Sequence, residues 1–420
     1  MTTLTRSLPT AAMRCVLTAL LLMVVAPLEA GDRNIPVIEI TTADGTAVVT
    51  RDWHQNTALK VVMPNGSTVL EDHHVWVKAH GNSSFNKPKK PLTLKFDHDV
   101  SLLGMTPNRK WFLVSNFMDH SLLRNALALT IARQTALAWT SDWRMVDIVV
   151  NGTPQGCYLL GEEIHVGKQW VDIDPTTGFL VELDAYGSDG QHFTTDIRQL
   201  PVNIRYPETA TDEQTAKLQE IFRQVESRLY APGRQPLDSL YAHWLDIDTF
   251  VDYFIVQELC QNAECNGPRS TYMYVGRDGK LHAGPVWDFD LAFVNLGLDA
   301  GGDIRPARFH LPQVRNLTID SLYNDRALWY GRLLQDTTFR QRLAQRWKTL
   351  EPRFRALTDS LDQWITTIAP SAVADQAMWG EKDPARFDNY TQFEPSADNL
   401  RMVFARRIEL LGNIIEQLAH

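Results

Sequence analysis

The first half of the chain, from residue 35 to about residue 184, carries apolar side chains at alternating positions. Segments 75–77 and 92–96 show this most clearly, because an apolar residue returns at every second position. A strand that buries one face requires this period of two. Asn151-Gly152 separates two further apolar segments, and both residues tolerate the positive φ of a tight turn. The pattern therefore predicts a strand-rich first half with a hairpin over residues 145–160.

A helical period interrupts these strands once. The apolar residues between 123 and 131 share one face of a helix. Asp119 or Ser121 can cap this helix at its amino end, because a short polar side chain there accepts backbone N–H bonds. We expect the helix to run to about Leu137.

From about residue 211 the period becomes mainly helical. A loop at 262–268 and a predicted hairpin at 270–286 are the exceptions, and the hairpin leads into Asp288-Phe289-Asp290. Four segments are predicted as helices: 214–229, a segment capped by Asp246 or Asp248 that ends at Leu259, 339–350 and 400–418.

A strand-rich half followed by a helix-rich half indicates an α+β architecture in two lobes. The expected amino-terminal lobe covers residues 31–210 and the expected carboxy-terminal lobe covers residues 211–420. We place the candidate catalytic and metal-binding segment near residues 262–295.

The composition is that of an ordinary globular protein, with 420 residues of which 44% are hydrophobic and 22% charged. The formal charge is −9, from 41 basic and 50 acidic residues. Proteins that bind nucleic acid normally present a basic surface that displaces counterions. The acidic balance therefore argues against a nucleic-acid partner.

The first thirty residues have the pattern of a secretory signal peptide. Arg6 and Arg14 precede an apolar run over 15–26, and Ala30 supplies a small residue for cleavage. The run is shorter than the about 20 residues of a membrane-spanning helix, and no comparable run follows. We expect cleavage near Ala30, export to the periplasm or the cell exterior, and no transmembrane segment.

Three cysteines would remain after cleavage, Cys157, Cys260 and Cys265. Cys260 and Cys265 could pair across one turn, and burial of all three as small apolar residues is the alternative. No Cys/His spacing is typical of a zinc site, and the adjacent His73-His74 fits a solvated strand edge better.

Two segments combine the residue types that phosphoryl transfer needs. The turn-rich segment 81–91 offers backbone N–H groups and lysines, which can cradle phosphates. Asp288 and Asp290 point to one face of an extended segment, so both could reach one divalent metal. Protein kinases also place a helix, an acidic loop residue, a hairpin and a metal-binding acid in this order. Glu264 is the acidic loop residue here.

Each of these features also has an ordinary explanation. Loop carboxylates commonly cap and solvate turns, and a lysine run such as 87–90 is commonly a solvated loop. Glu162 could orient one of the lysines or lie on the surface. The sequence lacks the G-x-G-x-x-G, V-A-I-K and H-R-D motifs, which excludes an ordinary protein kinase.

A longer series of motifs favours the phosphoryl-transfer interpretation over the ordinary one. In chain order they are His80-Gly81-Asn82-Ser83-Ser84, Lys89-Lys90-Pro91, Leu103-Gly104, Lys110-Trp111, Asp119 with Leu123-Arg124-Asn125, Asn151-Gly152, Gly156 with Tyr158 and Glu162, Glu182 with Asp184, and Gly284-Pro285-Val286-Trp287-Asp288-Phe289-Asp290. Over roughly residues 78–295 the chain resembles the spore coat protein H (CotH) kinase family.

The resemblance implies a highly diverged two-lobe protein-kinase-like fold. It implies an exported atypical kinase that uses ATP and Mg²⁺ or Mn²⁺ to phosphorylate serine or threonine hydroxyls of a protein substrate. By resemblance, Lys90 or Lys95 would contact the ATP phosphates and Glu162 would orient that lysine. The remaining roles implied are metal binding by Asp288 and Asp290, hydroxyl activation by Glu264, and nucleotide binding by Gly81, Ser83, Arg124 and Asn125.

Two positions depart from the family pattern. Glu264 stands where the family usually has aspartate, and the extra methylene moves the carboxylate by about 1 Å, which can cost about 100-fold in rate. His80 stands where the family usually has arginine, and a mostly neutral imidazole is a poorer phosphate donor. A second hypothesis is therefore a catalytically impaired scaffold that binds cell-surface or coat components. Some of the twelve tryptophans could then stack on sugars, although core packing is their ordinary role.

Overall fold

The computed structural model of the protein describes residues 33–184, 190–232, 236–262, 268–293, 328–382 and 390–419. The predicted signal peptide over residues 1–30 lies outside these residues. Glu264 and Cys265 also lie outside them, so the predicted acid and the possible Cys260–Cys265 pair are not described. Cys157 and Cys260 are both buried.

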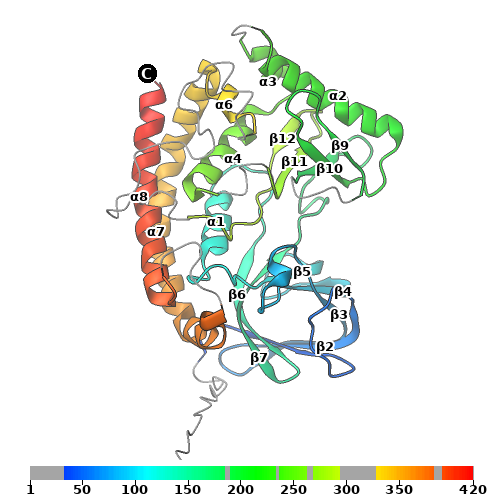
Figure 1. Cartoon of the computed structure of the whole chain (residues 1–420), viewed down its shortest axis with the longest axis vertical. Helices are drawn as coiled ribbons and strands as arrows, with labels where there is room; N and C mark the ends of the chain where they lie inside the picture. Colours follow the sequence, from blue (N-terminus) through cyan, green and yellow to red (C-terminus); the bar gives the residue numbers. More distant parts are fainter. Residues whose placement is uncertain are drawn as a thin grey trace, which may run out of the picture.

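Seven strands of the first half close into a barrel (Figure 1). Their order is β1-β2-β3-β4-β5-β7-β6, and the parallel pairing of β1 with β6 closes the sheet on itself. The strands are β1 (Val37–Thr41), β2 (His54–Val62), β3 (Thr68–Ala79), β4 (Leu92–Val100), β5 (Asn108–Val114), β6 (Trp143–Val150) and β7 (Thr153–Glu162).

Alternate side chains of these strands fill the barrel. Val75, Val77, Leu94 and Phe96 are all buried in its core, which confirms the alternation predicted for β3 and β4. Asn151-Gly152 joins β6 to β7 with φ of +49° and +76°, which confirms the predicted hairpin turn.

A second sheet has the strand order β12-β11-β8-β10-β9. Its central strand β8 pairs with β10 on one side and with β11 on the other. The expected lobe boundary at residue 210 therefore falls between strands of one sheet. The strands are β8 (Phe179–Leu183), β9 (His192–Thr194), β10 (Pro201–Tyr206), β11 (Thr271–Val275) and β12 (Leu281–Ala283).

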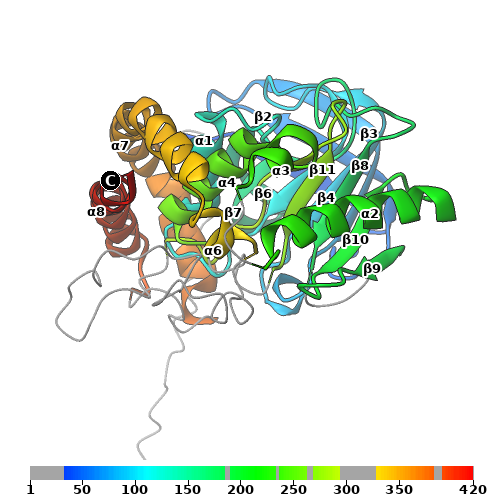
Figure 2. The same ribbon diagram turned by 90° about the horizontal axis from the view of Figure 1, so that it is seen from above.

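Helices cover this second sheet and one side of the barrel. Helix α2 lies across the second sheet in Figure 2, and α7 and α8 run side by side along one edge of the molecule in Figure 1. The helices are α1 (Arg124–Arg133), α2 (Asp212–Leu229), α3 (Asp238–His243), α4 (Ile247–Cys260), α6 (Tyr330–Leu333), α7 (Thr337–Trp379) and α8 (Phe393–Ala419), with short 3-10 turns η1 (Ser84–Asn86) and η3 (Gly380–Lys382).

Asp246 caps α4 as predicted, since it accepts the Thr249 N–H at 2.8 Å. At α1 the cap residue is Leu123, and neither Asp119 nor Ser121 holds the predicted cap position, although Asp119 accepts the Arg124 N–H. Thr211 and Gln214 form a reciprocal capping box at α2. The helix predicted to reach Leu137 is shorter, because α1 ends at Arg133. The predicted helix 339–350 is only part of α7, which has 43 residues and continues past Pro352 and Pro370.

The fold is thus mixed α and β, with a strand-rich amino-terminal region and a helical carboxy-terminal region. The resemblance implied a highly diverged two-lobe kinase-like fold. The closed barrel differs from the amino-terminal lobe of a protein kinase, because the pairing of β1 with β6 leaves no open edge. Among the described helices, none has the length and apolar character to cross a membrane.

Candidate active site

A cleft of about 680 Å³ is lined by both the barrel and the second sheet. Gly81 and Asp288 line the same cleft although they are far apart in the chain. Its walls come from the loop after β3, from β3, β4 and β5, from the ends of β7 and β8, from β10, and from the segments that flank β11 and β12. The glycine-containing loop and the acidic segment therefore face one space.

The loop after β3 favours glycine at its second position. Gly81 has φ of +98°, and a Cβ atom there would lie 2.3 Å from Oγ of Ser84. Its carbonyl accepts a hydrogen bond from Arg51 at 2.7 Å. Gly81, Asn82, Ser83 and Ser84 all line the cleft, so this turn forms part of its wall.

Three lysines line the cleft: Lys78, Lys87 and Lys110. Lys110 on β5 forms an ion pair with Glu163, which directly follows β7, at 3.0 Å. Both members of this pair line the cleft, so the carboxylate holds the ammonium group at its wall.

The lysines predicted to contact phosphates lie elsewhere. Lys90 donates to the Phe85 carbonyl at 2.6 Å, and Lys95 lies over the Trp76 ring with its Nζ 4.3 Å from the centroid. The structure brings neither Lys90 nor Lys95 into the lining of the cleft. The candidates for a phosphate-contacting lysine are therefore the three that line the cleft.

Glu162 is likewise turned away from the cleft, whose lining includes its neighbours Gly161 and Glu163. Glu162 stands opposite Trp111 in the β5–β7 register, and Trp111 belongs to the barrel core. Its carboxylate accepts the Asp142 N–H at 3.0 Å, and burial raises the pKa of this carboxyl. Glu162 thus contacts the backbone rather than a lysine.

Arg124 and Asn125, at the start of α1, were both predicted to bind the nucleotide, but their surroundings differ. Arg124 is buried and forms an ion pair with Asp119, whose other oxygen accepts the Arg124 N–H at 2.8 Å. Arg124 therefore fixes the start of the helix and does not line the cleft. Asn125 does line it.

The Asn125 side chain holds the acidic segment in place. Its Oδ1 accepts the Phe289 N–H at 2.9 Å, and its Nδ2 donates to Asp290 at 2.5 Å and to Asn116 at 3.0 Å. Phe289 is fully buried, which anchors the segment from the opposite side. Asp288 and Asp290 both line the cleft as a result.

Asp288 has a left-handed backbone with φ of +59°, a conformation that aspartate tolerates better than most residues. Asn262, which follows α4, donates to the Asp288 carbonyl at 3.2 Å, and the Ser270 hydroxyl lies 3.5 Å from Oδ2 of Asp288. Burial raises the pKa of the Asp288 carboxyl, and nearby Arg269 opposes this effect. These contacts set the direction of the carboxylate within the cleft.

Several residues of the cleft had no predicted role. Arg205 on β10 forms an ion pair with Glu182 on β8 at 2.6 Å. Glu182, Asp184 and Lys110 are among the motifs that carry the family resemblance, but the sequence predicts no role for them. Arg205 and Arg269 carry no local signal in the sequence, and both line the cleft in the folded chain.

An aromatic row forms another part of the wall. The His80 and Phe112 rings are 4.8 Å apart, and the Phe112 and Trp287 rings are 5.4 Å apart. Burial, assisted by the charge of Lys78, lowers the pKa of His80 to about 4. The imidazole is therefore neutral at pH 7.

The carboxylates of the cleft fit a magnesium ion held partly by a substrate. Asp288 and Asp290 offer hard oxygen ligands, and Mg²⁺ in nucleotide sites is commonly bound by one or two carboxylates together with phosphates and waters. Within the described part of the chain, three ligand side chains approach within 4.8 Å of one another at Asp246, Asp278 and His282, outside this cleft. The cleft therefore suits shared coordination better than an all-protein cage.

Comparison with known proteins identifies a family over most of the chain. A family model described as CotH kinase protein matches residues 77–411, which include the cleft and the helices behind it. No curated protein matches the sequence. Because the match covers most of the 420 residues, the chain belongs to the CotH kinase protein family.

Proposed function

We propose that the protein is an exported atypical kinase that transfers the γ-phosphoryl group of ATP to serine or threonine hydroxyls of a protein. The observation that carries this proposal is the convergence of the Gly81 loop, the Lys110–Glu163 pair and the Asp288–Asp290 segment on one cleft. Its volume of about 680 Å³ lies in the usual range for small-molecule sites. Export rests on the signal-peptide pattern of residues 1–30.

The phosphates would lie against the loop after β3. Backbone N–H groups of a tight turn attract anions, and Lys78, Lys87 and Lys110 also line the cleft. Lys110 would contact the phosphates, and Glu163 would orient it, in the roles that the sequence suggested for Lys90 or Lys95 and Glu162. The Phe112 and Trp287 rings offer faces on which the adenine could stack.

Asp288 and Asp290 would hold the divalent metal, Mg²⁺ or Mn²⁺. A bound divalent ion neutralises charge that develops on the transferred phosphoryl group. Asn125 fixes the direction of Asp290 through its amide, and Asn262 and Ser270 contact Asp288. Preorganised ligands of this kind lose little free energy to reorganisation during the reaction.

The chemical step joins the acceptor hydroxyl oxygen to the γ-phosphorus and breaks the bond to the oxygen that bridges the β and γ phosphates. The products are a phosphoserine or phosphothreonine and ADP. We assign Glu264, through the family resemblance, as the group that accepts the hydroxyl proton. Asn262, the last described residue before Glu264, donates to the Asp288 carbonyl.

A radiolabelled ATP assay tests the proposal. Asp288→Asn is expected to abolish label transfer to protein, while the circular dichroism spectrum stays that of the unsubstituted chain. Asp278→Asn, on the exposed turn before β12, is the matched control and should retain activity. Equal transfer by the Asp288 variant and the unsubstituted chain would overturn the assignment.

The alternative is a binding protein of the same family with impaired catalysis. The neutral state of His80 favours it, because this position then gives no positive charge to the phosphates. Thermal unfolding distinguishes the two functions, since a ligand that binds only the folded state raises Tm. A rise with Mg-ATP supports the kinase, and a rise only with glycan or a coat protein supports the scaffold.

A further inference from the structure

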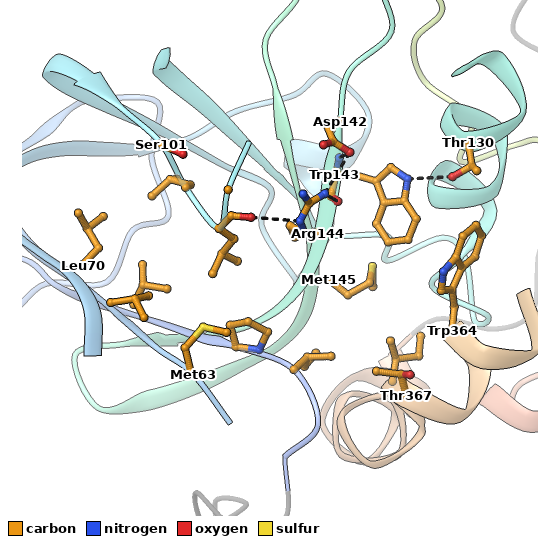
Figure 3. Close-up of a pocket in the computed structure, with 18 of the residues that line it drawn as sticks. Met63, Leu70, Ser101, Thr130, Asp142, Trp143, Arg144, Met145, Trp364 and Thr367 are labelled. Atoms are coloured by element: carbon orange, nitrogen blue, oxygen red, sulfur yellow. Dashed lines mark hydrogen bonds and ion pairs between the residues drawn. The ribbon is translucent and has the colours of Figure 1, made fainter. Parts of the chain in front are cut away.

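A second cavity, of about 800 Å³, is formed by the barrel, α1 and α7 (Figure 3). We call it the barrel–α7 cavity. Met63, Leu70 and Met145 come from the barrel, whereas Trp364 and Thr367 come from α7. It shares no lining residue with the cleft, although Thr130 and Asp142 line this cavity while their chain neighbours Leu129 and Ser141 line the cleft.

Most of the surface of this cavity is apolar, and its hydroxyl groups are already engaged. Ser101 donates to the Met105 carbonyl at 2.7 Å, and Thr367 donates to the Gln363 carbonyl at 2.7 Å. Thr130 donates to the Ala126 carbonyl and accepts from the Trp143 indole at 3.0 Å. A polar ligand body would therefore lose hydrogen bonds with water and gain few in return.

Charge is concentrated at one place in the lining. Arg133 on α1 and Arg144 on β6 both pair with Asp142, at 2.6 Å and 3.0 Å. Arg144 also donates through Nε to the Leu103 carbonyl at 3.2 Å, which fixes its guanidinium at the wall (Figure 3). Among the residues that line the cavity, two arginines and one aspartate leave one positive charge, although the whole chain has a formal charge of −9. Glu162 lies outside the lining, where its carboxylate accepts the Asp142 N–H and interacts with Arg133. Each guanidinium has five N–H donors, so donors remain for an anion.

We propose that the barrel–α7 cavity binds an amphiphile with an apolar chain and one anionic head group, of the long-chain carboxylate class. The apolar chain would occupy the space between Met63, Met145 and Trp364, and the head group would lie at Arg133 and Arg144. A nucleotide fits poorly, because several phosphate charges would face one net positive charge and an apolar wall. A peptide also fits poorly, because the closed barrel offers no free strand edge for its backbone.

Calorimetric titration of the full chain tests this inference without any measurement of phosphoryl transfer. The probes are dodecanoate, dodecanol and dodecyltrimethylammonium, each kept below the concentration at which it forms micelles. We expect one dodecanoate per chain, bound about 10-fold more tightly than dodecanol, because a charge-assisted hydrogen bond contributes about 1.5 kcal/mol or more. The cationic probe should bind more weakly than dodecanol.

Two variants assign binding to the cavity. Arg133→Gln removes one guanidinium and Thr367→Phe fills part of the space, and each should weaken dodecanoate binding about 10-fold. Arg109→Gln, which removes an exposed arginine paired with Asp99 on the barrel surface, is the control and should leave binding unchanged. Equal affinity for dodecanoate and dodecanol, or unchanged binding in both cavity variants, would overturn the proposal. The outcome is independent of the Asp288 assay, so the two proposals can fail separately.

Discussion

Asn125 donates a hydrogen bond from its side-chain amide to the carboxylate of Asp290 at 2.5 Å, and the same amide accepts the backbone N–H of Phe289. A residue in the first turn of α1 therefore fixes an acidic segment that follows β12. The contact joins α1, which lies between β5 and β6 in the chain, to the segment after β12, and it adds to the burial of Phe289 in holding the two aspartates at the cleft.

Asn125→Asp should lower kcat/KM for phosphoryl transfer by about 100-fold, a loss typical of a displacement of about 1 Å in a catalytic group. The new carboxylate keeps the acceptor for Phe289 but repels Asp290. Steady-state kinetics with radiolabelled ATP measure the effect. Asn65→Asp, in the exposed turn between β2 and β3, is the matched control, because the Ser67 N–H keeps its acceptor. A loss smaller than about threefold would remove Asn125 from the set of positioning residues.

Lys110→Met should raise KM for ATP at least 10-fold, because it removes the lysine that Glu163 holds at the cleft wall. Lys95→Met is the comparison, since Lys95 lies over Trp76 and outside the cleft lining. Activity assays over a range of ATP concentrations separate the two variants. The reverse pattern would restore the assignment that the sequence alone suggested.

Gly81→Ala should impair ATP binding, because the new Cβ would meet Oγ of Ser84 and force this hydroxyl, which lines the cleft, into another direction. Gly66→Ala is the matched control. Gly66 also has a positive φ, of +81°, but a Cβ there would meet nothing within 4 Å. Both variants should lose about 1 kcal/mol of folding free energy to backbone strain. Only Gly81→Ala should reduce the Tm shift that Mg-ATP produces.

Lys89→Met should lower the free energy of unfolding by about 3–5 kcal/mol, because it leaves a buried carboxylate without its partner. Lys89 donates to Asp375 on α7 at 2.5 Å and to the Cys157 carbonyl at 2.6 Å, and both ionic side chains are buried. Urea denaturation measures the loss. Lys60→Met, which breaks an exposed pair with Glu39 at 4.0 Å, should cost less than about 1 kcal/mol.

A double variant identifies the cause of that loss. Lys89→Met combined with Asp375→Leu should recover most of the stability, because both charges of the buried pair are then removed. Recovery should be incomplete, since the Cys157 N–H loses the Asp375 acceptor at 2.8 Å. A double variant no more stable than the single one would show that packing, and not charge, causes the loss.

The pKa of His80 predicts a dependence of stability on pH. Burial lowers this pKa to about 4 from 6.5, so between these values the unfolded chain binds a proton that the folded chain does not. Protonation of His80 therefore does not lower the free energy of unfolding above about pH 6.5. As the pH falls toward 4, the free energy of unfolding decreases by about 2–3 kcal/mol. Urea denaturation at several pH values should show a flatter profile for His80→Gln than for the unsubstituted chain. His192→Gln, an exposed histidine on β9, should leave the profile unchanged.

The strands and helices could largely be predicted from the sequence, because local periodicity determines them. Val75 and Leu94 are buried where the alternation placed them, and Asp246 caps α4 as its position before an apolar run indicated. The closure of the barrel could not be predicted, because it depends on the parallel pairing of β1 with β6, which are separated by about a hundred residues and have no local signal for each other.

The residues of the cleft could also be predicted only in part. The Gly81 turn and the Asp288 segment could be found as motifs, but the lysine that reaches the cleft could not. Sequence proximity favoured Lys90 and Lys95, whereas cross-strand pairing brings Lys110 beside Glu163. Glu162 and Glu163 differ only in the face of the chain on which they lie, and a shift of one residue decides between the barrel interior and the cleft.

The second sheet takes its central strand from before residue 210 and its neighbour β11 from after it. A fragment that ends at residue 210 would leave one whole side of β8 with unpaired backbone groups, and such edges promote aggregation. Neither half of the gene should therefore yield a soluble product when expressed alone. During synthesis, the ribosome must synthesise nearly three hundred residues before the second sheet has all its strands.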